Sequence, residues 1–275
     1  MPRKNLNDLN FGTAFGSSDV LRQSAEVAVV IPTTGRPQLA SALRSVFSQT
    51  LPGPIQVLIG VDGGGEIPES LRDVMAEMPE WISMYVLHLP YSTSRRHGGM
   101  HPARDGGALR TILTFMANSR YVAYLDDDNQ WLPNHLHLLR KHITGLNFAF
   151  SHRLIIDEED NENLGPDIWD STGPGSGRFS AVGGFVDPSC LMVDKIKLGP
   201  ALHRWSDTPT GEPLPGSDVW FFQAIASLSH AAISEPTVRY STRRDNILQR
   251  FVREGISPAA AIRDFPPLKP MFRKV

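Results

Sequence analysis

Several features that would decide the class of this protein are missing from its sequence. The 275 residues include a single cysteine, Cys190, which excludes an internal disulfide and is typical of a reducing compartment. No stretch holds the roughly 20 consecutive apolar residues that a membrane-spanning helix needs. The N-terminal residues lack the apolar core of a signal peptide. We therefore expect a cytoplasmic protein without a transmembrane segment, and peripheral contact with a membrane stays open.

An excess of one charge and internal repeats are missing as well. The formal net charge is -2, so the chain has no overall basic field that would hold nucleic acid. The composition is that of an ordinary globular protein, and the length suffices to bury a substantial core. We expect one continuous domain, in which residues 1–24 form a loose polar arm and residues 25–146 and 147–275 form two packed halves.

Strands and helices alternate four times in the first half. The predicted strands, which are short β-branched apolar runs, are residues 26–32, 54–62, 82–89 and 120–126. The predicted helices are residues 37–49, 67–78, 102–117 and 132–145, although Gly106 and Gly107 weaken the third of them. Such alternation is typical of the α/β class, with a Rossmann-like, mostly parallel central sheet that is flanked by helices.

The second half is less regular, and we expect it to pack on the first as a smaller mixed region. The predicted strands are residues 147–157 (read as paired strands), 185–194 (broken at Pro188) and 237–241. The predicted helices are residues 218–228 and 246–254, the latter followed by a Pro-rich tail. Residues 171–177 and 208–218 are rich in Gly and Pro, which predicts loops.

Polar residues follow three of the predicted strands. These groups are Thr33-Thr34-Gly35-Arg36, Asp62-Gly63-Gly64-Gly65 and Asp126-Asp127-Asp128. Because ligands bind beyond the carboxyl ends of the strands in open sheets of this kind, we expect all three groups at one edge of the sheet. The glycines after Asp62 are either a flexible turn or a place where backbone approaches a ligand. No G-x-G-x-x-G opens a helix after the first strand, so a dinucleotide site is weakly supported.

The repulsion between the three consecutive aspartates, Asp126 to Asp128, must be offset by other interactions. Two like charges 4 Å apart repel by about 1 kcal/mol in water, and by more near a low-dielectric surface. A solvated acidic turn is one explanation. A divalent cation is the other, since Mg²⁺ and Mn²⁺ prefer carboxylate and phosphate oxygens. The apolar strand before Asp126 and the Trp131-Leu132-Pro133 stretch after the cluster favour the cation.

Three stretches of the first half carry a combined signal. They are VVIPTTGRPQLASALRSVFSQT, QVLIGVDGGG and PARDGGALRTILTFMANSRYVAYLDDDNQWLPNHL. In order and spacing they resemble the nucleotide-sugar-binding half of a family 2 glycosyltransferase with the GT-A fold. The resemblance covers roughly residues 26–145 and, more weakly, 180–245. It implies a nucleotide-diphosphate sugar donor, most often a UDP-sugar, an acceptor hydroxyl of unknown kind, and inversion at the transferred sugar. It makes residues 147–275 the acceptor-binding half.

The resemblance also implies roles for individual residues. Asp62 and Thr33 would hold the nucleoside, Asp126 would face the same side, and Asp128 would bind Mn²⁺ or Mg²⁺ under the diphosphate. Arg104 matches the arginine of an Ala-Arg-Asn signature, with Asp105 where asparagine is usual. The full set of expected donor-binding residues is Pro32, Thr33, Thr34, Arg36, Asp62, Arg104, Asp126, Asp127 and Arg243.

A carboxylate is expected to deprotonate the acceptor hydroxyl. The position that the family uses, at the start of a late helix, matches GSDVWFF, so Asp218 is the predicted base. Its alternative explanation is an ordinary helix N-cap. Glu212 is the reserve candidate, and Asp187 is a more distant one.

Other residues permit alternatives. Arg95 and Arg96, with His97 and His101, supply cations that either neutralise a diphosphate or form a solvated face. Many family members carry a late histidine near the last strand that helps to hold the metal; here Arg243 and Arg244 occupy that stretch, and an arginine could replace the cation. Three histidines of one predicted helix, His135, His137 and His142, are a weak zinc signal.

Two other enzyme classes and one non-catalytic class are alternatives to a glycosyltransferase. An Asp-x-Asp phosphohydrolase is disfavoured because the cluster lies mid-chain and lacks the Thr or Val expected two residues after its second Asp. A nucleotidyltransferase is disfavoured because no Gly-rich loop with a trailing Lys follows the first strand. A non-catalytic nucleotide-sugar-binding module stays open, since the fold alone does not decide activity.

Overall fold

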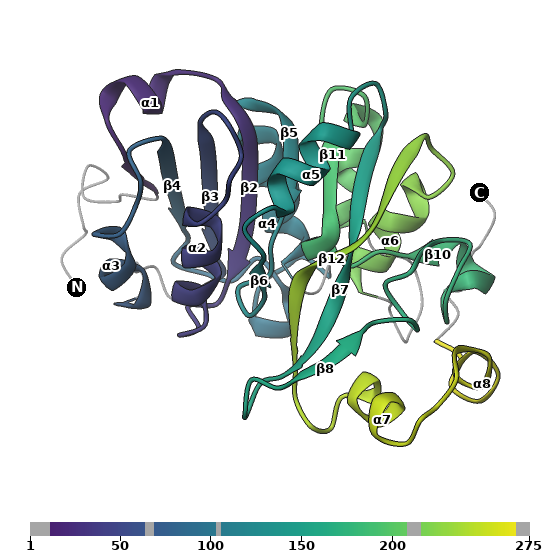
Figure 1. Ribbon diagram of the computed structural model, residues 1–275. Helices are drawn as coiled ribbons and strands as arrows, with labels where there is room; N and C mark the ends of the chain where they lie inside the picture. The colour runs from purple at the N-terminus through teal and green to yellow at the C-terminus, as the bar shows by residue number, and fades with distance from the viewer. Residues whose placement is uncertain (1–11, 64–68, 103–105, 208–215, 268–275) are drawn as a thin grey trace.

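The computed structural model describes residues 12–63, 69–102, 106–207 and 216–267, and it confirms the α/β class. One mixed sheet of ten strands runs through both halves of the chain (Figure 1). Its parallel part consists of β4 (Ile82–His88), β3 (Ile55–Val61), β2 (Ala25–Thr33) and β5 (Ser119–Tyr124), in that spatial order. Because β3 and β5 lie on opposite sides of β2, the strand order reverses there, and ligands of such sheets bind at this reversal.

The second half extends the same sheet beyond β5. The order continues through β11 (Leu191–Asp194), β7 (Phe148–Asp157), β12 (His230–Thr242) and β6 (Gln130–Trp131), and β8 (Asn163–Pro166) pairs with β7. β11 is antiparallel to both of its neighbours, so β7 runs in the same direction as β5. A separate two-stranded sheet joins β9 (Gly173–Pro174) to β10 (Gly184–Phe185).

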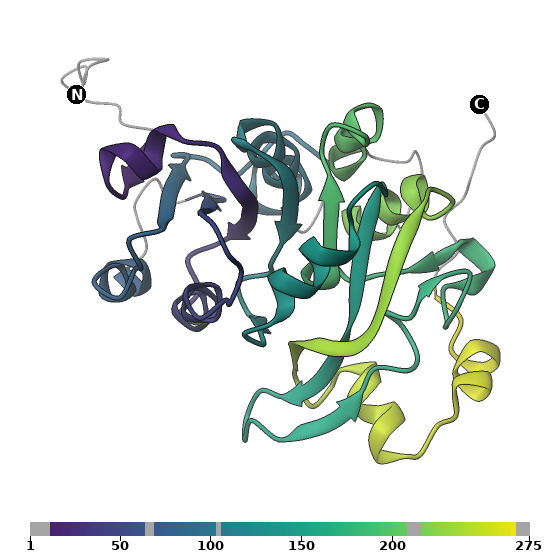
Figure 2. The ribbon, with the colours of Figure 1, turned by 45° about the horizontal axis from the view of Figure 1, so that its top comes forward.

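Helices cover both faces of the sheet. In Figures 1 and 2, α2 (Leu39–Phe47), α3 (Glu69–Met75) and α5 (His135–His142) lie on one face, and α4 (Gly107–Met116) lies on the other. The second half adds α6 (Ser217–Ile225), α7 (Ile247–Arg253) and α8 (Pro258–Asp264). Among the described residues, no helix combines the length and the apolar character that crossing a bilayer requires.

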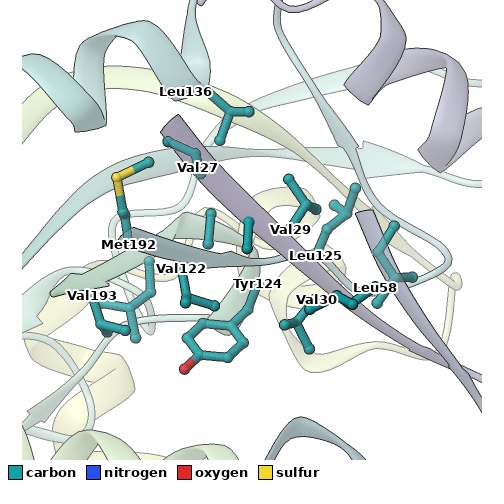
Figure 3. Close-up of a cluster of buried hydrophobic side chains, with 14 of the residues drawn as sticks. Val27, Val29, Val30, Leu58, Val122, Tyr124, Leu125, Leu136, Met192 and Val193 are labelled. Carbon is teal, nitrogen blue, oxygen red and sulfur yellow. The ribbon is translucent and has the colours of Figure 1, made fainter. Parts of the chain in front are cut away.

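The core fills the space between the sheet and these helices. Figure 3 shows Leu136 of α5 above Val27, with the ring of Tyr124 on the opposite side of the strands. All three side chains are fully buried. Burial of one such large side chain stabilises the fold by about 1.5–3 kcal/mol. The buried strands therefore hold the loops at their carboxyl ends in fixed positions.

Gly106 and Gly107, which weaken the predicted helix, are required where they stand. Gly106 has a φ of +72°, and a Cβ there would lie 2.6 Å from the side chain of Pro32 at the end of β2. A Cβ on Gly107 would lie 2.2 Å from the carbonyl oxygen of Trp205. The two glycines thus let the N-terminus of α4 approach the end of β2 and the 3₁₀ helix Gly199–Ser206.

Several expectations are corrected by the structure. Residues 1–24 were predicted to be a loose arm, but Gly12–Phe15 form β1, an edge strand paired with β4, and Ser18–Arg22 form α1. Residues 148–157 form the single strand β7 rather than paired strands. Part of the expected Pro-rich tail is α8, which Ser257 caps by accepting a hydrogen bond from the amide of Ala260. The break at Pro188 is confirmed as a short 3₁₀ helix, Pro188–Cys190.

His135 is fully buried, and among the described residues it belongs to no group of side chains that could hold a metal ion. Its ring stacks on Trp131 at 4.4 Å between centroids, and its Nδ1 lies 2.7 Å from the hydroxyl of Thr237. Because that hydroxyl donates to Ser151, Nδ1 donates its proton to Thr237. Burial lowers the pKa of His135 to about 3.

We expect His135 to make the fold acid-sensitive. An unfolded histidine takes up a proton near pH 6.5, whereas folded His135 takes one up only near its lowered pKa of about 3. The contribution of neutral His135 to the free energy of unfolding is therefore complete above pH 6.5. As the pH falls from 6.5 towards 3, this contribution decreases by about 1.4 kcal/mol per pH unit. Urea unfolding at pH 7, 5 and 4 should show a smaller loss in His135→Gln than in the wild type. His137→Gln, an exposed position of the same helix, is the control; equal pH slopes in all three proteins would contradict the assignment.

Candidate functional site

A pocket of about 450 Å³ opens at the carboxyl ends of the parallel strands. Nine of the residues that the sequence predicts as site residues line it: Pro32, Thr33, Thr34, Arg36, Asp62, Asp126, Asp127, Asp128 and Asp218. The three polar groups that follow β2, β3 and β5 thus contribute to one cavity. A second, shallower pocket of about 390 Å³ around Trp81 and Pro54 contains none of the predicted residues.

The end of β2 is tied to the Asp cluster through Thr33. Its hydroxyl donates to Asp127 at 2.6 Å and accepts from the amide of Gly35 at 2.9 Å. Gly35 has a φ of +87°, so the turn after β2 uses a conformation that favours glycine. Asp127 is 6% exposed. Thr33 and Asp127 therefore act together in fixing the two loops that frame the pocket.

Two arginines neutralise part of the charge of the Asp cluster. Arg36 donates to Asp128 at 2.8 Å and lies 3.7 Å from Asp127. Arg110, from α4, pairs with Asp126 while its own side chain is 4% exposed. Among the described residues, two guanidinium groups thus form ion pairs with the three carboxylates of the cluster.

The pKa values of two of these aspartates are raised, with burial as the largest cause. Burial, followed by the neighbouring charges of Asp126 and Asp127, raises the pKa of Asp128 to about 7. Burial raises the pKa of Asp127 as well, against the hydrogen bond from Thr33. A divalent cation beside Asp128 would relieve both effects, and oxygen donors of this kind suit Mg²⁺ and Mn²⁺. Among the described residues, no group of three or more His, Cys, Asp or Glu side chains is arranged so that it could hold a metal ion.

Asp62 lies at the end of β3 and is strongly engaged by its own chain. Its Oδ1 accepts from the amide of Thr93 at 2.6 Å and from the hydroxyl of Thr93 at 2.9 Å. Its Oδ2 accepts from the hydroxyl of Ser92 at 2.9 Å. A carboxylate has about four acceptor positions, so the loop that follows β4 uses most of the acceptor capacity of Asp62.

Asp218 occupies the first turn of α6 and lines the pocket. The N-cap of that helix is Gly216, and no side chain caps it. The side chain of Asp218 is half-buried, and its Oδ1 lies 2.8 Å from the amide of Val219. The alternative explanation, that this aspartate is the helix N-cap, therefore does not match the structure.

Several residues that line the pocket, among them Arg110 and Tyr240, were not predicted as site residues. Arg110 carries a buried charge in the middle of a predicted helix, and that pattern was a usable signal. Asp187 had been ranked as a distant base candidate, but it lines the pocket beside Tyr240. Its Oδ2 accepts from buried Arg153 at 2.5 Å, and Arg153 lies 3.6 Å from the ring centre of Tyr240. Asp187 is thus already paired within the protein.

Other predicted residues lie elsewhere. Arg243 was predicted to face the donor phosphates, but it is not among the residues that line the pocket. Its side chain is 74% exposed and lies 3.5 Å from Glu158. Arg104 and the reserve base candidate Glu212 lie outside the described residues. His142 hydrogen-bonds the carbonyl oxygen of Leu138 on its own helix, so it does not form a cation site with His135.

Solved structures share this fold. The chain is similar to the crystal structure of S. aureus TarS 1-349 in complex with UDP-GlcNAc, with a TM-score of 0.56 and 12% identity over 82% of this chain and 60% of that chain. It is also similar to the mannosyltransferase PcManGT from Pyrobaculum calidifontis in complex with GDP-Man and Mn²⁺, with a TM-score of 0.53 and 13% identity over 84% and 61%. This chain therefore spans about three fifths of the length of those structures.

The fold is thus the GT-A-like fold that TarS and the mannosyltransferase PcManGT share. No protein-family profile matches the chain. No curated protein matches it either.

Proposed function

We propose that the protein transfers a sugar from a nucleotide-diphosphate sugar to an acceptor hydroxyl. The observation that carries this proposal is the meeting of Asp62, the Asp126–Asp128 cluster and Asp218 in one pocket, at the strand reversal of a GT-A-like sheet. TarS was crystallised with UDP-GlcNAc and PcManGT with GDP-Man, which supports a donor of this class. A UDP-sugar is the first donor to test.

The strand ends supply the donor-binding groups in this proposal. Pro32, Thr33, Thr34 and Asp62 form the nucleoside side, with the remaining acceptor position of Asp62 available to the base. Asp126 lies between this side and the phosphates, where Arg110 holds its carboxylate in place. Arg36 lies between the nucleoside side and the phosphate side of the proposed donor site, because it contacts both Asp127 and Asp128.

Asp128 is the proposed metal ligand. A bound Mn²⁺ or Mg²⁺ would neutralise the diphosphate and stabilise the charge that develops on it as it leaves. PcManGT was crystallised with Mn²⁺, which supports a divalent cation in this fold. On the protein's side, Arg36 orients the Asp128 carboxylate, and Thr33 fixes the neighbouring Asp127.

Asp218 is the proposed general base. It would take the proton of the acceptor hydroxyl while the acceptor oxygen forms its bond to the anomeric carbon. The bond from that carbon to the donor phosphate breaks, and the nucleoside diphosphate leaves with both electrons. Attack from the face opposite the diphosphate would invert the sugar. Asp218 on α6 and the Asp cluster after β5 come from different elements that line the same pocket, as this geometry requires.

Calorimetric titration with nucleotides tests the donor site directly. We expect one of UDP, GDP, dTDP and CDP to bind in the presence of Mn²⁺, and to bind at least tenfold more weakly in EDTA, because the carboxylates of the Asp cluster then repel the diphosphate. Asp128→Asn should reduce the difference between Mn²⁺ and EDTA. Asp19→Asn, at an exposed helix start far from the pocket residues, is the matched control.

Each outcome of that titration has a distinct meaning. Binding that is unaffected by EDTA would keep the transferase and assign phosphate neutralisation to the arginines. A failure of all four nucleotides to bind, with or without metal, would refute the donor-site assignment of Asp62 and Asp128.

A further inference from the structure

Residues 92–101, which follow β4, form a compact loop with a buried stem and an exposed tip. The stem side chains Ser92 and Ser94 are 8% and 4% exposed. The amide of His101 donates to the carbonyl of Thr93 at 3.1 Å, and the amide of Arg95 donates to the carbonyl of His101 at 2.7 Å. A Cβ on Gly99 would lie 2.2 Å from the carbonyl oxygen of Ser92, so the two sides of the loop are in close contact.

The stem is attached to the sheet through one carboxylate. Asp62 accepts three hydrogen bonds from Ser92 and Thr93, at 2.6–2.9 Å. Hydrogen bonds to an ionised group are among the stronger ones in proteins. The Ser92 hydroxyl also accepts a hydrogen bond from the amide of Ser94 at 3.1 Å. This bond fixes the backbone at the residue that precedes the tip.

The tip of the loop is cationic and faces the donor pocket. It consists of the 3₁₀ helix Arg95–His97, and both Arg96 and His97 line the pocket. Arg36 and Arg110, which also line it, form ion pairs with the pocket's own aspartates. The tip therefore adds positive charge from an element that is separate from the Asp cluster.

We propose that Asp62 is a positioning residue, whose carboxylate holds residues 92–101 in the shape that places Arg96 and His97 beside the phosphates of the donor. The ligand class is a pyrophosphate group. The proposal rests on the proposed function above, and it adds a role for Asp62 that differs from reading the base. It also explains why most of the acceptor capacity of this carboxylate is directed at its own chain.

The anchor can be measured without any ligand. In hydrogen exchange followed by NMR, Asp62→Asn should exchange the amides of Thr93 and His101 at least tenfold faster than the wild type, with the core amides of β3 unchanged. Asp19→Asn is the matched control, because that aspartate is exposed at the start of α1 and does not line the pocket. Unchanged protection of Thr93 in Asp62→Asn would overturn the anchor.

The phosphate role is measured with three probes: UDP, inorganic pyrophosphate and uridine. We expect the double variant Arg96→Ala, His97→Ala to bind UDP and pyrophosphate about tenfold to a hundredfold more weakly and uridine equally well. Asp62→Asn should weaken pyrophosphate binding to a similar extent, and the triple variant should lose little more pyrophosphate affinity, because the two changes act on one element. In the Arg96→Ala, His97→Ala variant, a general loss of structure would weaken uridine binding too.

Four binding results would overturn the proposal. The first is an Asp62→Asn variant that changes the preference between UDP and GDP but keeps its affinity for pyrophosphate, as expected of a residue that only reads the base. The second is additive losses in the triple variant. The third is a wild-type protein that binds no nucleotide, which removes the proposed function as well. Wild-type binding of UDP that is unaffected by all these variants would refute the inference alone.

Discussion

Asp218→Asn is expected to lower turnover by about 10²–10⁴-fold and to leave nucleotide affinity within about twofold of the wild type. The amide keeps the shape of the side chain at the start of α6 but cannot accept the proton of the acceptor hydroxyl. The assay is the release of nucleoside diphosphate from a panel of nucleotide sugars, with candidate saccharides or water as the acceptor. Donor binding is measured in parallel by calorimetry.

Two control variants make this result specific. Asp19→Asn changes an aspartate in the first turn of α1, so it reports the general effect of such a change at a helix start. Asp187→Asn tests the other pocket carboxylate that had been considered as a base, and we expect it to disturb the buried pair with Arg153 rather than the proton transfer alone. Full turnover in Asp218→Asn would exclude Asp218 as the base. A wild type that binds a nucleotide sugar but never releases the diphosphate would favour the non-catalytic binding module.

The parallel part of the fold could be predicted because each of its strands is encoded locally. β2, β3 and β4 are β-branched apolar runs whose bounds differ from the predicted ones by one residue at most at each end. β1 and β6 were not predicted, because strands of four and two residues bury too little to leave a periodic pattern. β12 was predicted only as residues 237–241, since register shifts around Pro236 interrupt its first half.

The site was predictable where it depends on strand ends. Thr33 is the last residue of β2, and Asp62 and Asp126 come after β3 and β5. The carboxyl ends of parallel strands meet at one edge. Asp187 and Tyr240 reach the pocket only because β11 and β12 join the same sheet, a strand order that no local pattern encodes. Arg243 was misplaced for the same reason: β12 pairs Thr242 with Asp157 of β7, which brings the next residue beside Glu158.

Loss of Arg110 should lower the stability of the ligand-free protein. Its side chain is 4% exposed and its partner Asp126 is 29% exposed. Removal of one member of a buried pair costs about 3–5 kcal/mol, and we expect about 2–3 kcal/mol for Arg110→Met because water reaches part of Asp126. Repulsion between neighbouring aspartates adds to this loss of stability. Without Arg110, Arg36 is the one remaining ion-pair partner of Asp126, Asp127 and Asp128 among the residues that the structure describes.

Urea unfolding of a double-mutant cycle isolates this effect. Arg110→Met should be much less stable than the wild type, and Asp126→Asn combined with it should recover much of the loss, because the uncompensated charge is then removed. Arg44→Met is the control, since its pair with Glu77 is about half exposed on both sides and should contribute little. If Arg110→Met were no less stable than Arg44→Met, the repulsion within the Asp cluster would be relieved by solvent alone, and the solvated acidic turn would be the better description of Asp126–Asp128.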